Sequence, residues 1–297
     1  MPISTSEPRP FLLVLGLGYS AQRFVDLYGG SFSRIAATGR RADRLQAWAA
    51  RGVETHVFDG TVPAGLAEAA RAASHVLVSV PPGPEGDPAF NVLGEALHAN
   101  ASLRWIGYLS TTGVYGDCGG EWIDESAPVR PGNARSLWRA AAEEAWLGLA
   151  APGRAVQVFR LSGIYGPRRN ALAELKAGTA KRVIKPGQVF NRIHVDDIAR
   201  VLAAAIERPH AGPVFNLADE VPAPAHEVVE YAACLLGVAP PPLTPLDEAG
   251  LSDMAKTFWA ENKRVAARRI RDELGLDLLY PGYREGLEAL FAAGEGR

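Results

Sequence analysis

A glycine-rich turn directly after an apolar run constrains the fold more than any other feature of the chain. Residues 11–15 read Phe-Leu-Leu-Val-Leu, and residues 16–21 read Gly-Leu-Gly-Tyr-Ser-Ala. This order predicts a buried strand, a tight turn and a helix whose first N–H groups face an anion. The turn therefore favours dinucleotide binding, and a strand–helix turn without a ligand stays open as the alternative. The candidate ligands in it are Gly16, Gly18, Tyr19 and Ser20.

Short apolar runs alternate with helical patterns along the first half of the chain, which predicts parallel strands joined by right-handed crossovers. Strands are expected at 11–15, 33–38, 53–58, 75–80, 104–109 and 155–160. Helices are expected at 19–28, 42–50, 63–72, 88–100 and 134–149. The predicted fold class is α/β: a Rossmann-type doubly wound parallel sheet with a small, mainly helical C-terminal substrate region.

The regular alternation ends after residue 160. A helix capped by Asp196 or Asp197 is expected to run to residue 207, and a strand is expected at 213–217. From Pro222 onward the sequence predicts helices interrupted by the prolines at 240–242. We expect a nucleotide-binding Rossmann domain made of 9–168 and 191–218, and a smaller substrate-covering region made of 169–190 and 219–297.

Composition excludes several classes of partner. With 297 residues, 47% of them apolar, the chain can bury a full core. Its net charge of −2 gives no reason to expect nucleic acid or a membrane surface as a partner. The two cysteines lie far apart, the histidines are dispersed, and the polar residues 1–10 show no secretion signal. We therefore expect a cytoplasmic protein with no metal site.

The end of the second predicted strand bears on the choice of coenzyme. The chain reads Ala-Thr-Gly-Arg-Arg over 37–41, with no carboxylate before Asp43 to hold the ribose 2′-hydroxyl of NAD. Arg40 and Arg41 suit the 2′-phosphate of NADP instead, because guanidinium groups bind phosphate in a bidentate manner. The interpretation favours NADP over NAD, and two solvated residues at a helix start remain the alternative.

Further coenzyme contacts are expected after the third and fourth strands. Asp59 can accept a hydrogen bond from the adenine amino group, and an ordinary turn aspartate is nearly as compatible with its position. The run Ser-Val-Pro-Pro-Gly over 79–83 closes the fourth strand, and its prolines prevent the strand from continuing. Ser79, Val80 and Pro81 are therefore expected to pass beside the coenzyme.

Three more motifs occur in a fixed order. Residues 109–116 read Leu-Ser-Thr-Thr-Gly-Val-Tyr-Gly, residues 160–167 read Arg-Leu-Ser-Gly-Ile-Tyr-Gly-Pro, and residues 191–199 read Asn-Arg-Ile-His-Val-Asp-Asp-Ile-Ala. With the glycine turn and Phe-Asn-Leu-Ala-Asp at 215–219, residues 11–235 resemble the extended and atypical short-chain dehydrogenase/reductase family. That family comprises the NAD(P)-dependent epimerases and dehydratases. Four ordered motifs make the resemblance far more specific than the glycines alone.

The resemblance implies catalysis by a Tyr-x-x-x-Lys pair and a Ser or Thr hydroxyl beside a bound nicotinamide. By motif position Thr111 takes the hydroxyl role, with a strand-end threonine satisfied by backbone as the alternative, and Ser110 joins the coenzyme contacts. Glu143 matches the glutamate that follows the pair in the family. This alignment puts Arg135 at the tyrosine position and Arg139 at the lysine position.

This departure changes the expected chemistry, because arginine stays protonated and cannot act as a general acid or base. Arg135 and Arg139 lie one helical turn apart and are candidates to bind a phosphate or carboxylate together. A surface ion pair between Arg139 and Glu143 is equally compatible. Tyr115 is a candidate proton carrier, although a packing role is more common for it. The Thr-Gly at 112–113 replaces the expected acid pair and argues against a dehydratase.

The segment between 166 and 192 is strongly basic. It carries seven basic residues and one acid, Glu174. The seven are Arg168, Arg169, Lys176, Lys181, Arg182, Lys185 and Arg192. In the family this stretch covers the substrate, so a basic lid favours a phosphate, a nucleotide diphosphate or a carboxylate. A solvated loop is the alternative. Arg168, Asn191 and Arg192 are the candidate substrate ligands.

Two functions remain open. The first is an NAD(P)-dependent epimerase-like or reductase-like enzyme that acts on an anionic small molecule, with a nucleotide sugar as one candidate and a proton supplied by water or a tyrosine. The second is a non-catalytic protein that binds NADP(H) and reports its redox state to a partner. The missing Tyr and Lys motivate the second hypothesis. The chain is expected to be a monomer or a homodimer.

Overall fold

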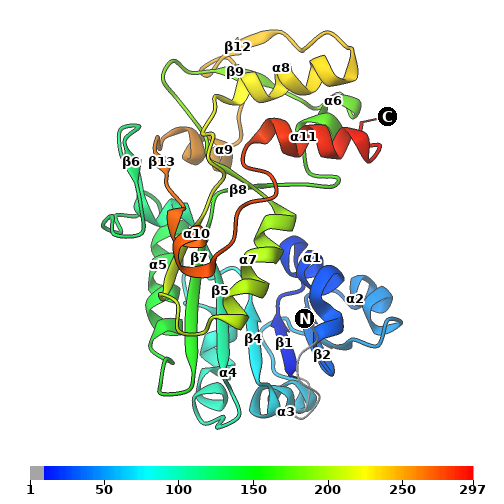
Figure 1. Cartoon of the computed structure of the whole chain (residues 1–297), viewed down its shortest axis with the longest axis vertical. Helices are drawn as coiled ribbons and strands as arrows, with labels where there is room; N and C mark the ends of the chain where they lie inside the picture. Colours follow the sequence, from blue (N-terminus) through cyan, green and yellow to red (C-terminus); the bar gives the residue numbers. More distant parts are fainter. Residues whose placement is uncertain (1–9, 297) are drawn as a thin grey trace. The chain divides into compact units, whose positions relative to one another are not determined.

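A computed structural model describes residues 10–296 (Figure 1). The predicted domain start at residue 9 and the polar residues before it lie outside the described part of the chain. The central sheet has seven strands in the order β11-β7-β5-β4-β1-β2-β3. Their bounds are β1 Phe11–Leu15, β2 Arg34–Gly39, β3 Glu54–Val57, β4 His75–Val78, β5 Trp105–Thr111, β7 Ala155–Leu161 and β11 Val214–Leu217. This strand order is that of a Rossmann fold, and it confirms the predicted α/β class.

Helices connect the strands in the predicted rhythm. The helices are α1 Tyr19–Tyr28, α2 Ala42–Ala49, α3 Ala64–Ala72, α4 Pro88–His98, α5 Ala134–Leu147 and α7 Val195–Glu207. Strand β1 pairs in parallel with β2 on one side and with β4 on the other, and β4 pairs in parallel with β5. Both β1 and α1 have the bounds that the sequence predicts, because the apolar run and the glycines mark these ends without help from distant residues.

Local chemistry explains how the helices begin. Helix α4 starts with Pro88 behind Asp87, whose carboxylate accepts hydrogen bonds from the N–H groups of Ala89 and Phe90 at 2.9 and 3.1 Å. This is a side-chain N-cap followed by proline at the first helical position. The second carboxylate oxygen of Asp87 accepts a bond from the indole of Trp146 at 3.0 Å, which ties α4 to α5.

The chain divides into two compact units. Among the described residues, unit 1 comprises 10–110, 138–159 and 199–214, and unit 2 comprises 111–137, 160–198 and 215–296. The core of unit 1 is built on the sheet, where all five residues of β1 are buried. The predicted division into a nucleotide-binding domain and a substrate-covering region is a division by function. Compactness does not test it, so it stays a prediction.

Unit 2 contains short strands that the sequence did not reveal. They form the parallel pairs β8–β10, β9–β12 and β6–β13. Their bounds are β6 Trp122–Ile123, β8 Gly163–Tyr165, β9 Arg182–Ile184, β10 Arg192–His194, β12 Leu243–Pro245 and β13 Arg264–Val265. The remaining helices are α6 Ala171–Lys176, α8 Ala225–Leu236, α9 Asp253–Trp259, α10 Arg268–Leu274 and α11 Tyr283–Ala292. The expected helical C-terminal region is present.

One predicted helix cap takes a different role. Helix α7 begins at Val195, and the carboxylate of Asp197 accepts hydrogen bonds from the backbone N–H groups of Leu279 and Tyr280 at 2.7 and 2.9 Å. Asp197 is completely buried. It therefore holds the loop before α11, a partner 82 residues away that no local pattern could indicate.

Candidate functional site

The glycine turn of unit 1 is locked between two strand ends. Gly16 adopts φ +91°, donates its N–H to the Thr38 hydroxyl at 2.8 Å, and accepts a bond from the Ser79 hydroxyl at 2.5 Å. A Cβ at Gly16 would lie 2.9 Å from the backbone nitrogen of Val80. Both the positive φ and this close approach require glycine. The turn thus brings β1 and the segment after β4 together.

The start of α1 is open to an anion. Gly18 is the N-cap residue with φ −85° and ψ −174°, and no side chain caps the helix. The first turn carries no acidic residue, and Gly18 is exposed. A Cβ at Gly18 would approach nothing closer than the Ser79 hydroxyl at 3.7 Å. An uncapped helix start behind an open glycine fits the linked phosphates of a dinucleotide, since helix N-termini attract anions.

The two arginines after β2 differ in their surroundings. Arg41 forms a bidentate ion pair with Asp43, with Nε–Oδ1 and Nη2–Oδ2 distances of 3.1 and 2.6 Å. The hydrogen bond to Asp43 raises the pKa of Arg41, and the same bond lowers the pKa of Asp43. Arg40 is exposed, and no ion pair of its side chain occurs among residues 10–296. Arg40 is therefore the more available of the two for a 2′-phosphate.

Two other predicted coenzyme contacts have partners inside the protein. The Asp59 carboxylate accepts bonds from the Thr61 N–H and hydroxyl at 3.2 and 2.8 Å, and the hydroxyl bond lowers the pKa of Asp59. This is the turn geometry named as the alternative. The buried Ser110 hydroxyl donates to the carboxylate of Glu143, which is itself only 3% exposed. Their contacts to a coenzyme stay predictions.

In unit 2, Thr111 is the N-cap residue of the short 3₁₀ helix η2 (Thr112–Tyr115), and Tyr115 is the last residue of that helix. The Thr111 hydroxyl accepts the Gly113 N–H at 3.1 Å and keeps its own proton to donate. The Tyr115 side chain is 1% exposed, donates to the Asn216 amide oxygen at 2.7 Å and accepts from Arg160 at 2.9 Å. Burial raises the pKa of Tyr115.

The arginines at the Tyr and Lys positions differ from each other. Arg135 is exposed at the start of α5. Arg139 is half-buried, and its Nη1 donates to the Leu109 carbonyl at 2.9 Å and to the Tyr108 hydroxyl at 3.2 Å. The alternative of an Arg139–Glu143 surface pair does not fit, because Glu143 is buried. Arg139 instead holds the end of β5 by direct bonds.

The predicted substrate ligands are also engaged. Asn191 donates to the Lys263 carbonyl at 2.9 Å and accepts the Val265 N–H at 2.8 Å. Arg192 donates to the carbonyls of Phe190 and Ala223 at 2.9 and 3.1 Å, and burial lowers its pKa. Arg168 alone among the described non-glycine residues has a positive φ, 63°, and its N–H bonds Glu295 at 3.0 Å.

Much of the basic segment is held by internal contacts. Lys181 donates to the Ala249 carbonyl at 2.9 Å, Lys185 donates to the Trp259 carbonyl at 2.6 Å, and Arg182 pairs with Glu230 at 2.6 Å. These bonds attach the segment to later parts of unit 2. The sequence therefore overstates the positive charge that this segment offers to a substrate.

The segment 261–263, which the sequence analysis did not identify, contacts both the residue after η2 and the residue before α5. The Lys263 ammonium donates to the Gly116 carbonyl at 2.5 Å and pairs with the Glu261 carboxylate at 2.7 Å. Both side chains are nearly buried, 9% and 13% exposed. Glu261 also accepts from Asn133, whose own side-chain oxygen caps α5 at Ser136. In the sequence, the local signal for this pair was a Lys two residues after a Glu.

Unit 2 also contains a buried carboxylate, Asp219. Asp219 is 1% exposed, and neither carboxylate oxygen has a hydrogen-bond partner among the described residues. Burial raises the pKa of Asp219 to about 7, against the attraction of Arg192. A carboxyl with this pKa changes charge near neutral pH.

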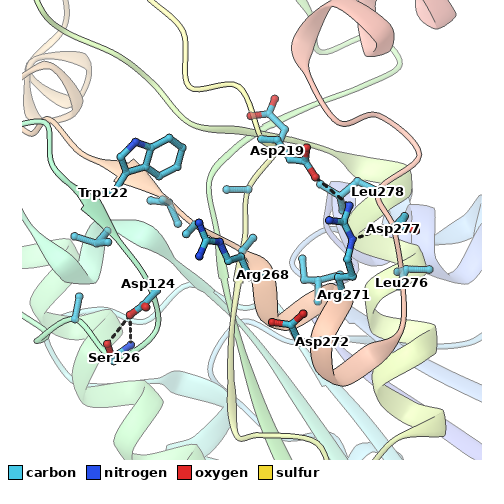
Figure 2. A pocket seen from close by; sticks show the side chains of 18 residues that line it. Trp122, Asp124, Ser126, Asp219, Arg268, Arg271, Asp272, Leu276, Asp277 and Leu278 are labelled. Carbon is cyan, nitrogen blue, oxygen red and sulfur yellow. Dashed lines mark hydrogen bonds and ion pairs between the residues drawn. The ribbon is translucent and has the colours of Figure 1, made fainter.

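Unit 2 also contains an open cavity of about 920 Å³. It is lined by the segment that begins with β6, the end of β11, and the segment from β13 through α10 (Figure 2). None of the predicted catalytic, coenzyme or substrate residues belongs to its lining. The described residues 10–296 contain no cluster of three or more His, Cys, Asp or Glu that could hold a metal ion. In that same part of the chain, no helix is long and apolar enough to cross a membrane.

Comparison with known proteins identifies relatives of the whole chain. The model of the NAD dependent epimerase/dehydratase family matches residues 89–218. A conserved protein of unknown function from Silicibacter pomeroyi DSS is 45% identical, over 96% of this chain and 99% of that one, with a TM-score of 0.86. A proposed NAD-dependent epimerase/dehydratase from Methylobacillus flagellatus is 26% identical, over 96% and 98% of the two chains, with a TM-score of 0.73.

Relatives with curated descriptions match a shorter stretch. The 3-diazoavenalumate denitrifying reductase of a Streptomyces species is 31% identical over 183 residues, which is 56% of this chain and 58% of that protein. The chain spans 58% of the length of the curated relatives it matches.

Proposed function

Because the chain belongs to the NAD dependent epimerase/dehydratase family, of the extended short-chain dehydrogenase/reductase type, we propose that it is an NAD(P)-dependent enzyme acting on an anionic small molecule. Reduction or epimerisation is the proposed reaction, and a nucleotide sugar is one candidate substrate. The reductase among its relatives supports the first of these reactions. The observation that carries the proposal is the uncapped start of α1 behind the open Gly18.

In unit 1, the backbone of Gly16, Gly18 and the first turn of α1 would hold the diphosphate of the coenzyme. Ser79 and the segment after it would line the same site. When bound, the nicotinamide would supply hydride to the substrate or take it away. The fit rests on charge and space: the helix start is positive, its first turn carries no acid, and among the described residues no side chain caps it.

We assign NADP as the preferred coenzyme, with Arg40 as the principal contact to its 2′-phosphate. Arg40→Ala combined with Arg41→Ala should weaken NADP binding by about 1–3 kcal/mol through lost charge-assisted bonds. Affinity for NAD, which lacks the phosphate, should change little. Calorimetry with both coenzymes measures the difference, and Arg71→Ala, an exposed arginine of α3, is the matched control. Equal losses for NADP and NAD would contradict the assignment.

Asp43 offers a second probe of the same assignment. Its two carboxylate oxygens accept hydrogen bonds from Nε and Nη2 of Arg41. Asp43→Asn removes the negative charge and should release Arg41, so NADP binding should tighten while NAD binding stays constant. An unchanged ratio of the two affinities would limit the phosphate contact to Arg40.

For the chemical step we propose Thr111 as the hydroxyl that orients the substrate oxygen, since its proton is free to donate. Thr111→Ala should lower turnover, and Thr111→Ser, which keeps the hydroxyl, should retain most of it. The assay is oxidation of NADPH across a panel of keto and hydroxy acids and nucleotide sugars. Full activity of Thr111→Ala on an identified substrate would remove Thr111 from the mechanism.

A second candidate function, a coenzyme-binding sensor without chemistry, is favoured by the surroundings of the predicted proton carriers. Tyr115 is buried between Asn216 and Arg160, and arginines occupy the Tyr and Lys positions. Tight binding of NADPH with no turnover on the whole panel would favour the sensor. Any turnover above that of Arg135→Ala would favour the enzyme.

A further inference from the structure

The cavity of unit 2 combines an apolar lining with charged side chains. Ala218, Val265 and Ile270 belong to the lining and are at most 2% exposed. Eighteen residues contribute in all, from segments far apart in the sequence. Because these segments pack into one unit, the cavity is a property of unit 2 alone.

Trp122 stands at the cavity with its ring available. The side chain is 58% exposed, although it lies on a strand whose backbone is fixed. Strand β6 pairs with β13, with Arg264 N–H to the Glu121 carbonyl and Ala266 N–H to the Ile123 carbonyl, both at 2.8 Å. An exposed indole on a fixed strand offers a flat apolar surface to a ligand, and covering it is favourable.

The two arginines of the cavity lining differ in the number of ion pairs that they form. Arg271 pairs with Asp277 at 2.5 Å and with Glu220 at 3.4 Å. Arg268 is exposed at the first position of α10, where its charge helps lower the pKa of the Asp124 carboxyl, and its side chain forms no ion pair or hydrogen bond among residues 10–296. Figure 2 shows its guanidinium directed to the side of the cavity where Trp122 lies.

We propose that this cavity is a second ligand site, independent of the coenzyme site, for a small aromatic molecule with one negative charge, such as an aromatic carboxylate. The ring packs on Trp122, and the anionic group pairs with Arg268. Arg271, the other arginine of the lining, is already paired with Asp277 and Glu220, so a ligand with more than one negative charge finds no second cation and meets the five carboxylates of the lining. This charge balance distinguishes the site from one for nucleotide phosphates.

The test uses three probes that share a ring and differ in charge: 2-naphthoate, 2-naphthyl phosphate and 2-naphthylmethylamine. Calorimetry on the full chain should show saturable binding of 2-naphthoate, with the doubly charged phosphate and the cationic amine each at least about tenfold weaker. Stronger binding of the amine or of the phosphate than of the carboxylate would overturn the proposal.

Single substitutions test whether 2-naphthoate binds at Trp122 and Arg268. Trp122→Ala and Arg268→Gln should each weaken 2-naphthoate by about tenfold or more, and Arg268→Lys, which keeps the charge, should retain most of the affinity. Phe258→Ala is the matched control, because Phe258 is 62% exposed and outside the lining. Arg271→Gln controls for an arginine that already has partners. No binding of 2-naphthoate, or equal binding to wild type and both variants, would overturn the proposal. Exposed positions keep these variants folded, which circular dichroism verifies.

Discussion

The two compact units treat their motif residues in opposite ways. In unit 1 the glycine turn is locked by Thr38 and Ser79, yet the helix start that follows has no side-chain cap and no acid in its first turn. In unit 2 Tyr115, Asn191 and Arg192 all have partners inside the protein. These residues thus leave donors open at the start of α1 in unit 1 and stabilise the fold at Tyr115, Asn191 and Arg192 in unit 2.

This difference teaches how far a motif can be interpreted. A motif gives the position of a residue in the fold, whereas its availability depends on the groups that pack against it. Gly18 is available because nothing caps α1. Asn191 is not available, because its side-chain amide donates to the Lys263 carbonyl and accepts the N–H of Val265. We therefore expect substitutions at the start of α1 in unit 1 to act mainly on binding, and substitutions at Asn191 and Arg192 in unit 2 to act mainly on stability.

The largest expected effect breaks the buried ion pair of unit 2. Lys263→Met leaves the Glu261 carboxylate nearly buried without its cation and removes the bond to the Gly116 carbonyl. Removing one partner of such a pair costs about 3–5 kcal/mol. Chemical denaturation measures the loss. The control is Lys256→Met, which breaks an exposed pair with Asp253 and should cost less than about 1 kcal/mol. Equal losses would show that the Lys263 pair is no more than a surface pair.

The next effect is a dependence of stability on pH that comes from Asp219. Its folded pKa of about 7 lies above the ordinary value of 3.8, so the folded state binds more protons between these values. The free energy of unfolding should therefore fall as pH rises from about 4 to 7, by on the order of 3 kcal/mol. Asp219→Asn should remove this fall. A stability that is constant over this range in wild type would refute the burial of a charged Asp219.

His75 in unit 1 should respond with the opposite sign. Burial lowers its pKa from 6.5 to about 4, so the unfolded state binds the proton more readily. Stability present above pH 6.5 should be lost as pH falls towards 4, by on the order of 2 kcal/mol. Denaturation curves of His75→Phe against wild type from pH 4 to 7 measure this. A steeper loss in the variant than in wild type would contradict the assignment.

The sequence predicted unit 1 better than unit 2 for a physical reason. The strands and helices of unit 1 follow from the spacing of apolar residues and from the positions of glycine and proline. These signals act over only a few residues of the chain. The bounds of β1 and α1 needed nothing more. In unit 2, β6 exists because it pairs with β13, and the register joins Trp122 to Arg264 across the chain. No local pattern carries such a pairing.

The candidate site divides in the same manner. Gly16 could be recognised because backbone conformation and space require glycine there, and Gly18 because it follows in the same motif directly before the helix. The role of Lys263 could not be recognised, since its partner Gly116 lies 147 residues away. The internal bonds of Tyr115 likewise join residues separated by 45 and 101 positions. The sequence shows which residue type stands at each position, but it does not show whether that side chain binds a ligand or stabilises the fold.

The smallest expected effect on stability tests the comparison most directly. Gly18→Ser places a hydroxyl at the N-cap of α1, where the extended backbone and the open space accept it. The new cap should stabilise the free protein by about a few tenths of a kcal/mol. It should also fill the approach to the helix start and weaken coenzyme binding by about tenfold or more.

Gly18→Ala separates these two effects, because a methyl group fills the same space and caps nothing. Coenzyme binding should weaken in both variants, whereas only the serine should gain stability from a cap. If the serine variant gained stability and bound the coenzyme as wild type does, the open helix start would not be the phosphate site. The contrast between the open helix start of unit 1 and the internally bonded motif residues of unit 2 would then have no functional meaning, because both sets of residues would only support the fold.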